Sequence, residues 1–306
     1  MSSKCLAPEA PSLCNAELVA VVFDLEAIGE GELTPGVLTV RAGEALPSGS
    51  LRTDHASLQR GMRHWVESLT GYRLGHTEQL YTFADTLSVG DITRLVRISY
   101  LALLHPSVDP RNWLSIYEYF PWEDRRKEGE AHQVGSIARR MMAWALNDAT
   151  QRTRCAVAFG LEGHEWNDEL VLQRYELMWQ AGLVPESPDG VGENAIGRAM
   201  EHDQRRILAT ALSRIRAKIR YTPAVFDLLP ERFTLFAVQQ AVEALAGRPM
   251  HKQNFRRLLL GQQLVEETDS LDSNGHGRPA RLYRFRRDHV QECYLTGARL
   301  PLPSLI

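Results

Sequence analysis

A short basic segment near the C-terminus carries the side chains with the most specific chemistry in this sequence. Residues 251–260, HKQNFRRLLL, place three apolar side chains on one helical face, and the opposite face carries Lys252, Gln253, Asn254, Arg256 and Arg257. These side-chain types pair with base edges and phosphates in the major groove of DNA. Gln253 and Arg257 lie nearest the centre of the face and are predicted to read bases. Lys252 and Arg256 lie toward its edge and are predicted to contact phosphates.

The segments on either side of this helix complete the pattern of a winged helix-turn-helix domain. Thr234 is the expected N-cap of a preceding helix, which a short turn joins to the basic one. Residues 264–269 and 280–285 read as two strands around a glycine-rich basic turn, which predicts a wing. Arg278 in the turn and Arg281 in the second strand are therefore predicted to contact DNA. Helix, turn, basic helix and hairpin in this order favour DNA binding over an unrelated solvated surface.

The charge distribution agrees with a DNA-binding C-terminal part. The formal net charge is −3, but residues 197–306 carry 18 Lys and Arg against 11 Asp and Glu, while residues 1–196 carry 17 against 27. A basic module on an acidic remainder suggests a polyanionic partner, although a solvated basic surface without a partner remains the alternative.

The N-terminal half reads as a mixed α/β layer. One helix with apolar residues at helical spacing, residues 57–69, is closed by Gly71. Four apolar stretches read as strands: residues 18–25, 37–40, 79–85 and 95–104. The order of strands, helix and strands predicts one sheet with a helix packed against it.

Helices dominate the middle of the chain. Prolines 106, 110 and 121 are expected to break regular structure, and two helical stretches follow at about 131–150 and 167–181. A long helix over 201–220 carries one apolar stripe, and arginines 205, 206, 214, 216 and 220 decorate the rest of it. The stripe, which is also a candidate dimer seam, consists of Leu208, Leu212, Ile215 and Ile219.

These elements predict four parts of the chain. They are a tail at residues 1–16, a sensor domain at 17–200 with a helical insertion at about 106–195, a linking helix at 201–222, and a winged-helix domain at 223–306. The chain length of 306 residues suits more than one domain.

Several other classes of protein are disfavoured. No apolar run reaches the roughly 18–20 residues of a membrane span, and the N-terminus has no secretory pattern. Four scattered cysteines without metal spacing indicate free thiols in a reducing cytoplasm. No His/Cys metal cluster, phosphate-binding glycine loop or convincing nucleophile is found, so we predict no metal, no cofactor and no catalytic residue.

Residues 46–72, LPSGSLRTDHASLQRGMRHWVESLTGY, resemble a degraded Nudix box. In that motif, glutamates on a helix bind divalent metal and activate hydrolysis of a nucleoside diphosphate. Aligned on Gly71 and Tyr72, the glutamate positions fall on residues without a carboxylate: Ala56, Trp65, Ser68 and Leu69. Glu67, the only acidic residue of the helix, lies one position off register. Because magnesium usually needs carboxylate ligands, the resemblance implies a retained scaffold without hydrolysis.

The combination of segments resembles the Nudix-related transcriptional regulators of NAD metabolism in bacteria (NrtR/NadQ-like). It rests on RAKIRYTPAVFDLLPERFTL (216–235), NFRRLLL, GRPARLYRF and EQLYTFAD (78–85), and covers about residues 17–104 and 200–287. The resemblance implies an α+β fold: a Nudix-like α/β/α sandwich with a mixed sheet, a helical insertion and a C-terminal winged helix-turn-helix. It also implies a homodimer that binds double-stranded operator DNA and a nucleotide effector such as ADP-ribose, NAD or ATP.

The implied nucleotide pocket lies within residues 17–104, over the sheet beside the box helix. Arg41 follows the second strand and is predicted to contact a phosphate, and Tyr81 is predicted to offer a stacking surface. The alternatives are an arginine that is merely exposed and a tyrosine that belongs to the core.

The favoured function is a cytoplasmic DNA-binding regulator, a repressor of NAD biosynthesis genes that senses a nucleotide through a catalytically inactive domain. A Nudix hydrolase with an accessory winged helix is the alternative, and the missing glutamates argue against it. A protein that uses the winged helix only for protein contacts is a third possibility, and the basic helix face argues against that one.

Overall fold

The computed structural model describes eight stretches of the chain: residues 14–28, 32–75, 77–86, 94–104, 112–126, 128–188, 195–272 and 279–286. Arg278, which the sequence analysis places in the wing, lies outside the described residues. No helix in the described stretches is both long enough and apolar enough to span a membrane.

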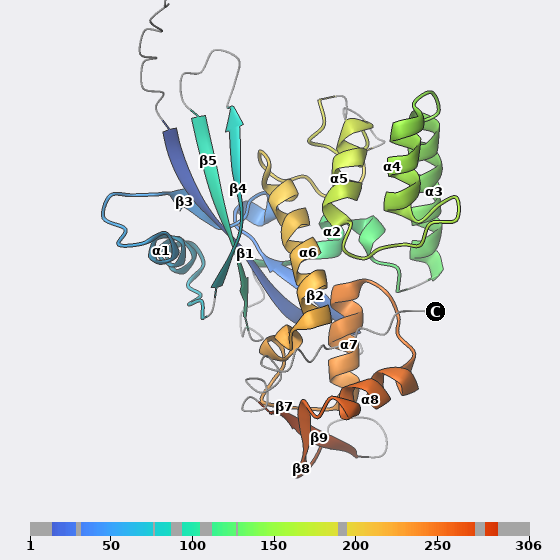
Figure 1. The fold of residues 1–306 in the computed structure, drawn as a ribbon. Helices are drawn as coiled ribbons and strands as arrows, with labels where there is room; N and C mark the ends of the chain where they lie inside the picture. Colours follow the sequence, from blue (N-terminus) through green and yellow to red (C-terminus); the bar gives the residue numbers. More distant parts are fainter. Residues whose placement is uncertain are drawn as a thin grey trace, which may run out of the picture.

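A six-stranded mixed sheet forms the N-terminal half (Figure 1). Its strands are β1 (Cys14–Ile28), β2 (Glu32–Leu38), β3 (Ser48–Ser50), β4 (Thr77–Thr86), β5 (Arg94–Leu103) and β6 (Trp113–Ser115). The order is β4-β5-β1-β2-β6, and β3 pairs with β1. Strands β1 and β5 are parallel, and the other pairs are antiparallel. Strand β1 begins at Cys14, so the sequence-predicted tail of residues 1–16 is too long by three residues.

Helices cover both faces of this sheet because the side chains of β1 are apolar on both sides. Leu18, Ala20 and Val22 pack with α1 (Leu58–Thr70) on one face. The alternate residues, Val19, Val21 and Phe23, belong to a larger core that includes α6 (Gln204–Tyr221) on the other face. Gly71 caps the C-terminus of α1 as the sequence predicts, with a left-handed φ of 80°, and Ser57 caps its N-terminus.

The middle of the chain contains more structure than the sequence predicts. After β6 come α2 (Ile116–Tyr119) and the short 3-10 helix η3 (Pro121–Glu123), in a stretch where prolines are expected to break regular structure. Proline suits the first turn of a helix because its missing N–H needs no partner there.

Three helices follow η3, beside the sheet (Figure 1). They are α3 (Glu128–Trp144), α4 (Ala149–Phe159) and α5 (Val171–Gln180). The sequence predicts a single helix over 131–150, but α3 ends at Trp144 and a new helix begins after Asp148. The Asp148 carboxylate accepts hydrogen bonds from the backbone N–H groups of Thr150 and Gln151 and so starts α4.

Helix α6 differs from the sequence prediction on both of its faces. All four residues of its apolar stripe, Leu208, Leu212, Ile215 and Ile219, are buried inside the chain itself and are not available as a dimer seam. Arg205 and Arg216, expected among the residues that decorate the outer face, are also fully buried. Their partners are glutamates distant in sequence, Glu186 and Glu123, which helical periodicity cannot reveal.

The C-terminal part has the element order of a winged helix. It contains η4 (Ala224–Leu228), β7 (Arg232–Phe233), α7 (Leu235–Ala246), α8 (Lys252–Gly261), β8 (Val265–Asp272) and β9 (Ala280–Phe285). The three strands form an antiparallel sheet in the order β7-β9-β8. Phe226 stacks on Phe285 with ring centroids 4.4 Å apart, which joins η4 to the wing.

Candidate nucleic-acid interface

The geometry of the helix-turn-helix is fixed by caps and by a buried polar cluster. The Thr234 hydroxyl accepts a hydrogen bond from the Ala237 N–H at the start of α7. In the turn, the Glu243 carboxylate accepts from the Met250 N–H at 2.7 Å and from the Gln239 amide at 2.9 Å. These bonds hold α8 at a fixed angle to α7, as a recognition helix requires.

Helix α8 has the two faces that its sequence predicts. Phe255 and Leu259 are buried against the core of the domain. All five residues expected to face DNA are solvent-exposed: Lys252, Gln253, Asn254, Arg256 and Arg257. Their individual roles, with bases at Gln253 and Arg257 and phosphates at Lys252 and Arg256, stay predictions.

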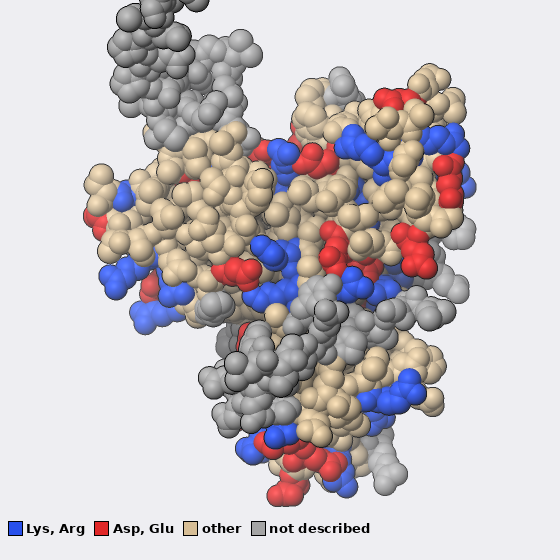
Figure 2. Space-filling model, viewed as in Figure 1, with Lys and Arg blue, Asp and Glu red and all other residues tan. Residues whose placement is uncertain are grey.

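The wing is less positive than its arginines suggest. Arg281 forms an ion pair with Glu267 at 2.8 Å, and Arg284 pairs with Glu266. Figure 2 shows blue and red side chains side by side at the lower end of the molecule, where Figure 1 places β8 and β9. The predicted phosphate contact of Arg281 would therefore require this side chain to release Glu267 or to share it.

We expect that Glu267→Gln strengthens DNA binding about two- to threefold at low salt, because Arg281 loses its competing carboxylate. Fluorescence anisotropy with a labelled duplex at two salt concentrations measures the change. The gain is expected to shrink at high salt, since both residues are exposed. Weaker binding of the variant would contradict a phosphate role for Arg281.

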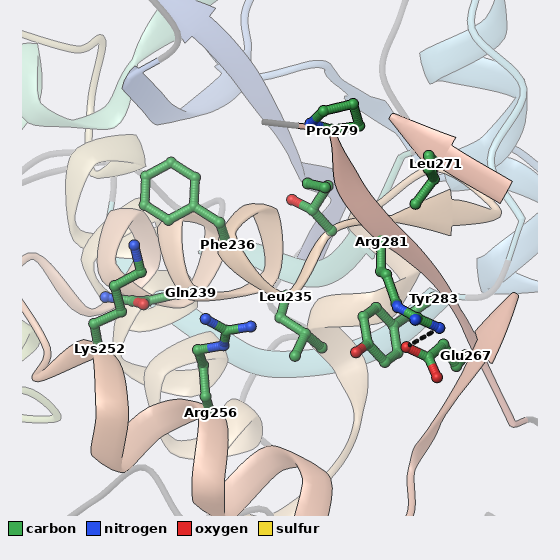
Figure 3. A pocket seen from close by; sticks show the side chains of 12 residues that line it. Leu235, Phe236, Gln239, Lys252, Arg256, Glu267, Leu271, Pro279, Arg281 and Tyr283 are labelled. Carbon is green, nitrogen blue, oxygen red and sulfur yellow. Dashed lines mark ion pairs between the residues drawn. The ribbon is translucent and has the colours of Figure 1, made fainter. Parts of the chain in front are cut away.

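A groove of about 780 Å³ lies between α7, α8 and the wing (Figure 3). Lys252 and Arg256 project into it from α8, and Arg281 lines it from β9. The first turn of α7, Thr234 to Phe236, forms its inner wall. The groove is lined by three cations and by one carboxylate, Glu267, which is paired with Arg281. The remaining positive charge of Lys252 and Arg256 and the nearby helix N-terminus give the groove an electrostatic preference for anions.

Two exposed apolar side chains in the groove were not identified from the sequence. Phe236 is 51% exposed, Leu271 is 57% exposed, and the Lys252 ammonium lies 5.4 Å from the Phe236 ring centroid. Phe236 lies off the apolar stripe of α7, and that departure is the sequence signal that could have identified it. Leu271 gives no comparable signal, because it lies in the part of β8 that follows residue 269, the predicted end of the strand.

The degenerate box helix α1 presents no carboxylate cluster. Glu67 pairs with Arg73 at 2.8 Å. On the same helix Trp65 and His64 form an aromatic cluster with His55, with ring centroids 5.5–6.3 Å apart. Within the described stretches, no group of three or more His, Cys, Asp or Glu side chains could hold a metal ion.

The two predicted nucleotide contacts lie apart in the sheet. Arg41 follows β2 and ion-pairs with Glu201, while Tyr81 on β4 is 60% exposed and packs on Phe83. Strands β5 and β1 separate β4 from β2, a distance of about 14 Å at the usual strand spacing. Arg41 and its neighbour Ala42 have left-handed φ values of 52° and 55°, a strained conformation that is common at functional sites.

Fold and surface together define a class of protein: a mixed sheet covered by helices on both faces, joined to a winged helix whose second long helix has an exposed basic face. Residues 225–285 match the family model of the NrtR DNA-binding winged helix domain. The match confirms the winged helix and the resemblance inferred from the sequence.

Among characterised proteins, the chain is similar to the ADPR-responsive transcriptional repressor NtrR of Acinetobacter baylyi. They are 38% identical over 93 residues, which make up 30% of this chain and 37% of the relative. The aligned part therefore spans little more than a third of that protein's length.

Two solved structures share the fold over most of the chain. The Shewanella oneidensis NrtR complexed with a 27-mer DNA has a TM-score of 0.50 and 19% identity, and covers 90% of this chain and 95% of its own. A MutT/nudix family protein from Enterococcus faecalis has a TM-score of 0.51 and 15% identity, over 92% of this chain and 90% of its own. Both confirm the predicted α+β fold class.

Proposed function

We propose that this protein is a DNA-binding transcriptional repressor of NAD biosynthesis genes, controlled by ADP-ribose or a related nucleotide. The observation that carries the proposal is the exposed basic face of α8, set beside an anion-attracting groove in a winged helix of the NrtR type. The similar Acinetobacter baylyi protein is an ADPR-responsive repressor, and the Shewanella oneidensis NrtR was crystallised with DNA. The first relative supports ADP-ribose as the effector, and the second supports double-stranded DNA as the partner. A regulator with a DNA partner of this kind acts in the cytoplasm.

A gel shift with the full chain tests DNA binding. The probes are duplexes from the upstream regions of the protein's own gene and of neighbouring genes, with a scrambled duplex of equal length as the control. Binding that prefers one natural duplex and changes when ADP-ribose is added supports the proposal. Equal binding to all duplexes contradicts it.

We propose that the nucleotide binds over the six-stranded sheet. Arg41 would contact a phosphate of the nucleotide, and Tyr81 would stack on one of its rings. Tyr81 lies on β4 and Arg41 follows β2, and these strands are about 14 Å apart, a separation that favours a ligand with two distant groups. An extended ligand such as a nucleoside diphosphate sugar fits this separation. Calorimetry with ADP-ribose, NAD and ATP on the full chain, repeated with Arg41→Ala, identifies the ligand and tests the arginine.

We propose that the repressor acts as a homodimer, because winged-helix repressors place two recognition helices about 34–36 Å apart on successive turns of DNA. The surface that joins the copies lies outside the α6 stripe, since that stripe is buried. Sedimentation of the free protein and of its DNA complex measures the stoichiometry.

We expect the protein to be inactive as a Nudix hydrolase. The helix that would carry the metal ligands has Trp65, Ser68 and Leu69 at three of the glutamate positions, and Glu67 is paired with Arg73. Purified protein incubated with ADP-ribose and Mg²⁺ is expected to release product no faster than a heat-killed sample. Metal-dependent turnover well above that control would favour the enzyme alternative.

A further inference from the structure

The last turn of α7 is one of the places where the winged helix contacts the sensor, and α7 also packs against β2 and α6. Three residues of the sensor side, Tyr117, Glu123 and Arg216, meet this turn in a buried polar cluster, which we call the α7 lock. The first turn of the same helix forms the inner wall of the DNA groove. One end of α7 is therefore held by the sensor, and the other end belongs to the DNA-binding surface.

The lock satisfies the carbonyl groups that every helix leaves unpaired at its C-terminus. The Tyr117 hydroxyl donates to the Ala244 carbonyl at 2.5 Å, and the Arg216 Nε–H donates to the Leu245 carbonyl at 2.9 Å. The positive guanidinium also complements the negative end of the helix dipole. The backbone N–H of Arg125, which follows η3, donates to the Gly247 carbonyl at 2.6 Å.

Glu123 holds Arg216 in place. Its carboxylate, fully buried, accepts hydrogen bonds from Arg216 at 2.5 Å and from Arg174 at 2.6 and 2.9 Å. Gly247 allows the close approach of the two parts: a Cβ at this position would lie 2.0 Å from the Glu123 carbonyl oxygen. The contact is thus built from specific hydrogen bonds between buried groups.

We propose that the α7 lock is the path by which the sensor controls the DNA-binding surface, with Tyr117, Glu123 and Arg216 as positioning residues. The inference rests on the proposed function, because it assigns the regulation of that same DNA site. Packed interfaces of this kind have discrete arrangements, so a ligand that favours one arrangement of the sensor shifts the orientation of α7 and of the α8 that it carries.

The chain offers a matched pair of variants. Tyr117→Phe removes the hydroxyl that binds α7. Tyr119→Phe removes a buried hydroxyl from the same short helix, but that hydroxyl donates to the Gly43 carbonyl within the sensor, at 2.7 Å. Because Gly43 lies in the same turn as Arg41, the variants are compared at ADP-ribose concentrations that saturate each of them. Each substitution deletes one hydrogen bond without burying a new charge, so both variants are expected to fold.

The first measurement is the factor by which saturating ADP-ribose changes the affinity of the full chain for its preferred duplex. In Tyr117→Phe, ADP-ribose is expected to change DNA affinity by a factor about fivefold smaller than in wild type. In Tyr119→Phe the factor is expected to stay within twofold of wild type. An unchanged factor in Tyr117→Phe, or an equal loss in both variants, overturns the proposal.

The second measurement needs neither DNA nor nucleotide. Hydrogen exchange of the Arg125 amide reports the lock directly, because this N–H bonds to Gly247. Its exchange is expected to be about fivefold faster in Tyr117→Phe than in Tyr119→Phe. If ADP-ribose does not change the DNA affinity of wild type, the proposed effector is wrong. The hydrogen-exchange comparison still tests the α7 lock in that case. Equal exchange in the two variants contradicts the lock itself.

Discussion

Replacing Arg257 with alanine is expected to lower affinity for the preferred duplex about ten- to a hundredfold and to relax sequence preference at one base pair. The side chain is exposed near the centre of the polar face of α8, opposite buried Phe255 and Leu259. The substitution should therefore leave the melting temperature and nucleotide binding unchanged. Competition binding against duplexes with single base changes measures the lost preference.

Arg256→Ala is the matched control, one residue away on the same helix. Arg256 faces the groove toward the wing, where a phosphate contact is expected. Its loss should weaken binding to all duplexes equally and lower the slope of log affinity against log salt by about 1. If Arg257→Ala keeps operator affinity at an unchanged melting temperature, α8 is not the recognition helix.

The local parts of the fold are predictable from this sequence because their signals are local. Thr234 caps the start of α7 and Gly71 caps the end of α1, where the sequence places them. Apolar stretches likewise locate β1, β2, β4, β5, β8 and β9, but the short strands β3, β6 and β7 were not predicted. The exposed polar face of α8 follows from helical periodicity alone, since Phe255 on the opposite side must face a core.

The buried charges could not be predicted in the same way. Arg216 looks like a solvated arginine on the outer face of a helix, and its partner Glu123 lies 93 positions earlier. Glu123 itself lies in a proline-rich stretch without periodicity. Ion pairs of this kind depend on how the insertion packs against α6, which short-range patterns do not encode. The same limit applies to Arg41, whose partner Glu201 comes from the segment before α6.

The ion-paired carboxylate of Glu123 makes the free energy of unfolding depend on pH. Burial alone would raise the pKa of this group, but the positive charges of Arg174 and Arg216 more than offset burial and hold its pKa below the usual 4.5. A carboxylate with a lowered pKa in the folded state stabilises the fold at pH values above its unfolded pKa. That contribution is lost as the pH falls through the folded value. Unfolding free energy should therefore decrease below about pH 4.5.

Glu123→Gln is expected to destabilise the protein by about 3–5 kcal/mol near pH 7, because it leaves two buried arginines without their counter-charge. That is a large fraction of the roughly 5–15 kcal/mol that stabilises a typical domain. Urea unfolding at several pH values measures both the loss and its dependence on acid. Below pH 4.5 the difference between wild type and variant should narrow, because Glu123 becomes protonated first in the unfolded wild-type chain and, at lower pH, in the folded protein.

Glu267→Gln is the matched control for this substitution, because it makes the same chemical change in an exposed ion pair of the wing. Exposed pairs contribute about 0–1 kcal/mol, so this variant should unfold close to wild type at every pH. A Glu123→Gln protein as stable as Glu267→Gln would mean that Arg174 and Arg216 find other partners. Glu123 would then not be the residue that holds the arginine cluster against α7.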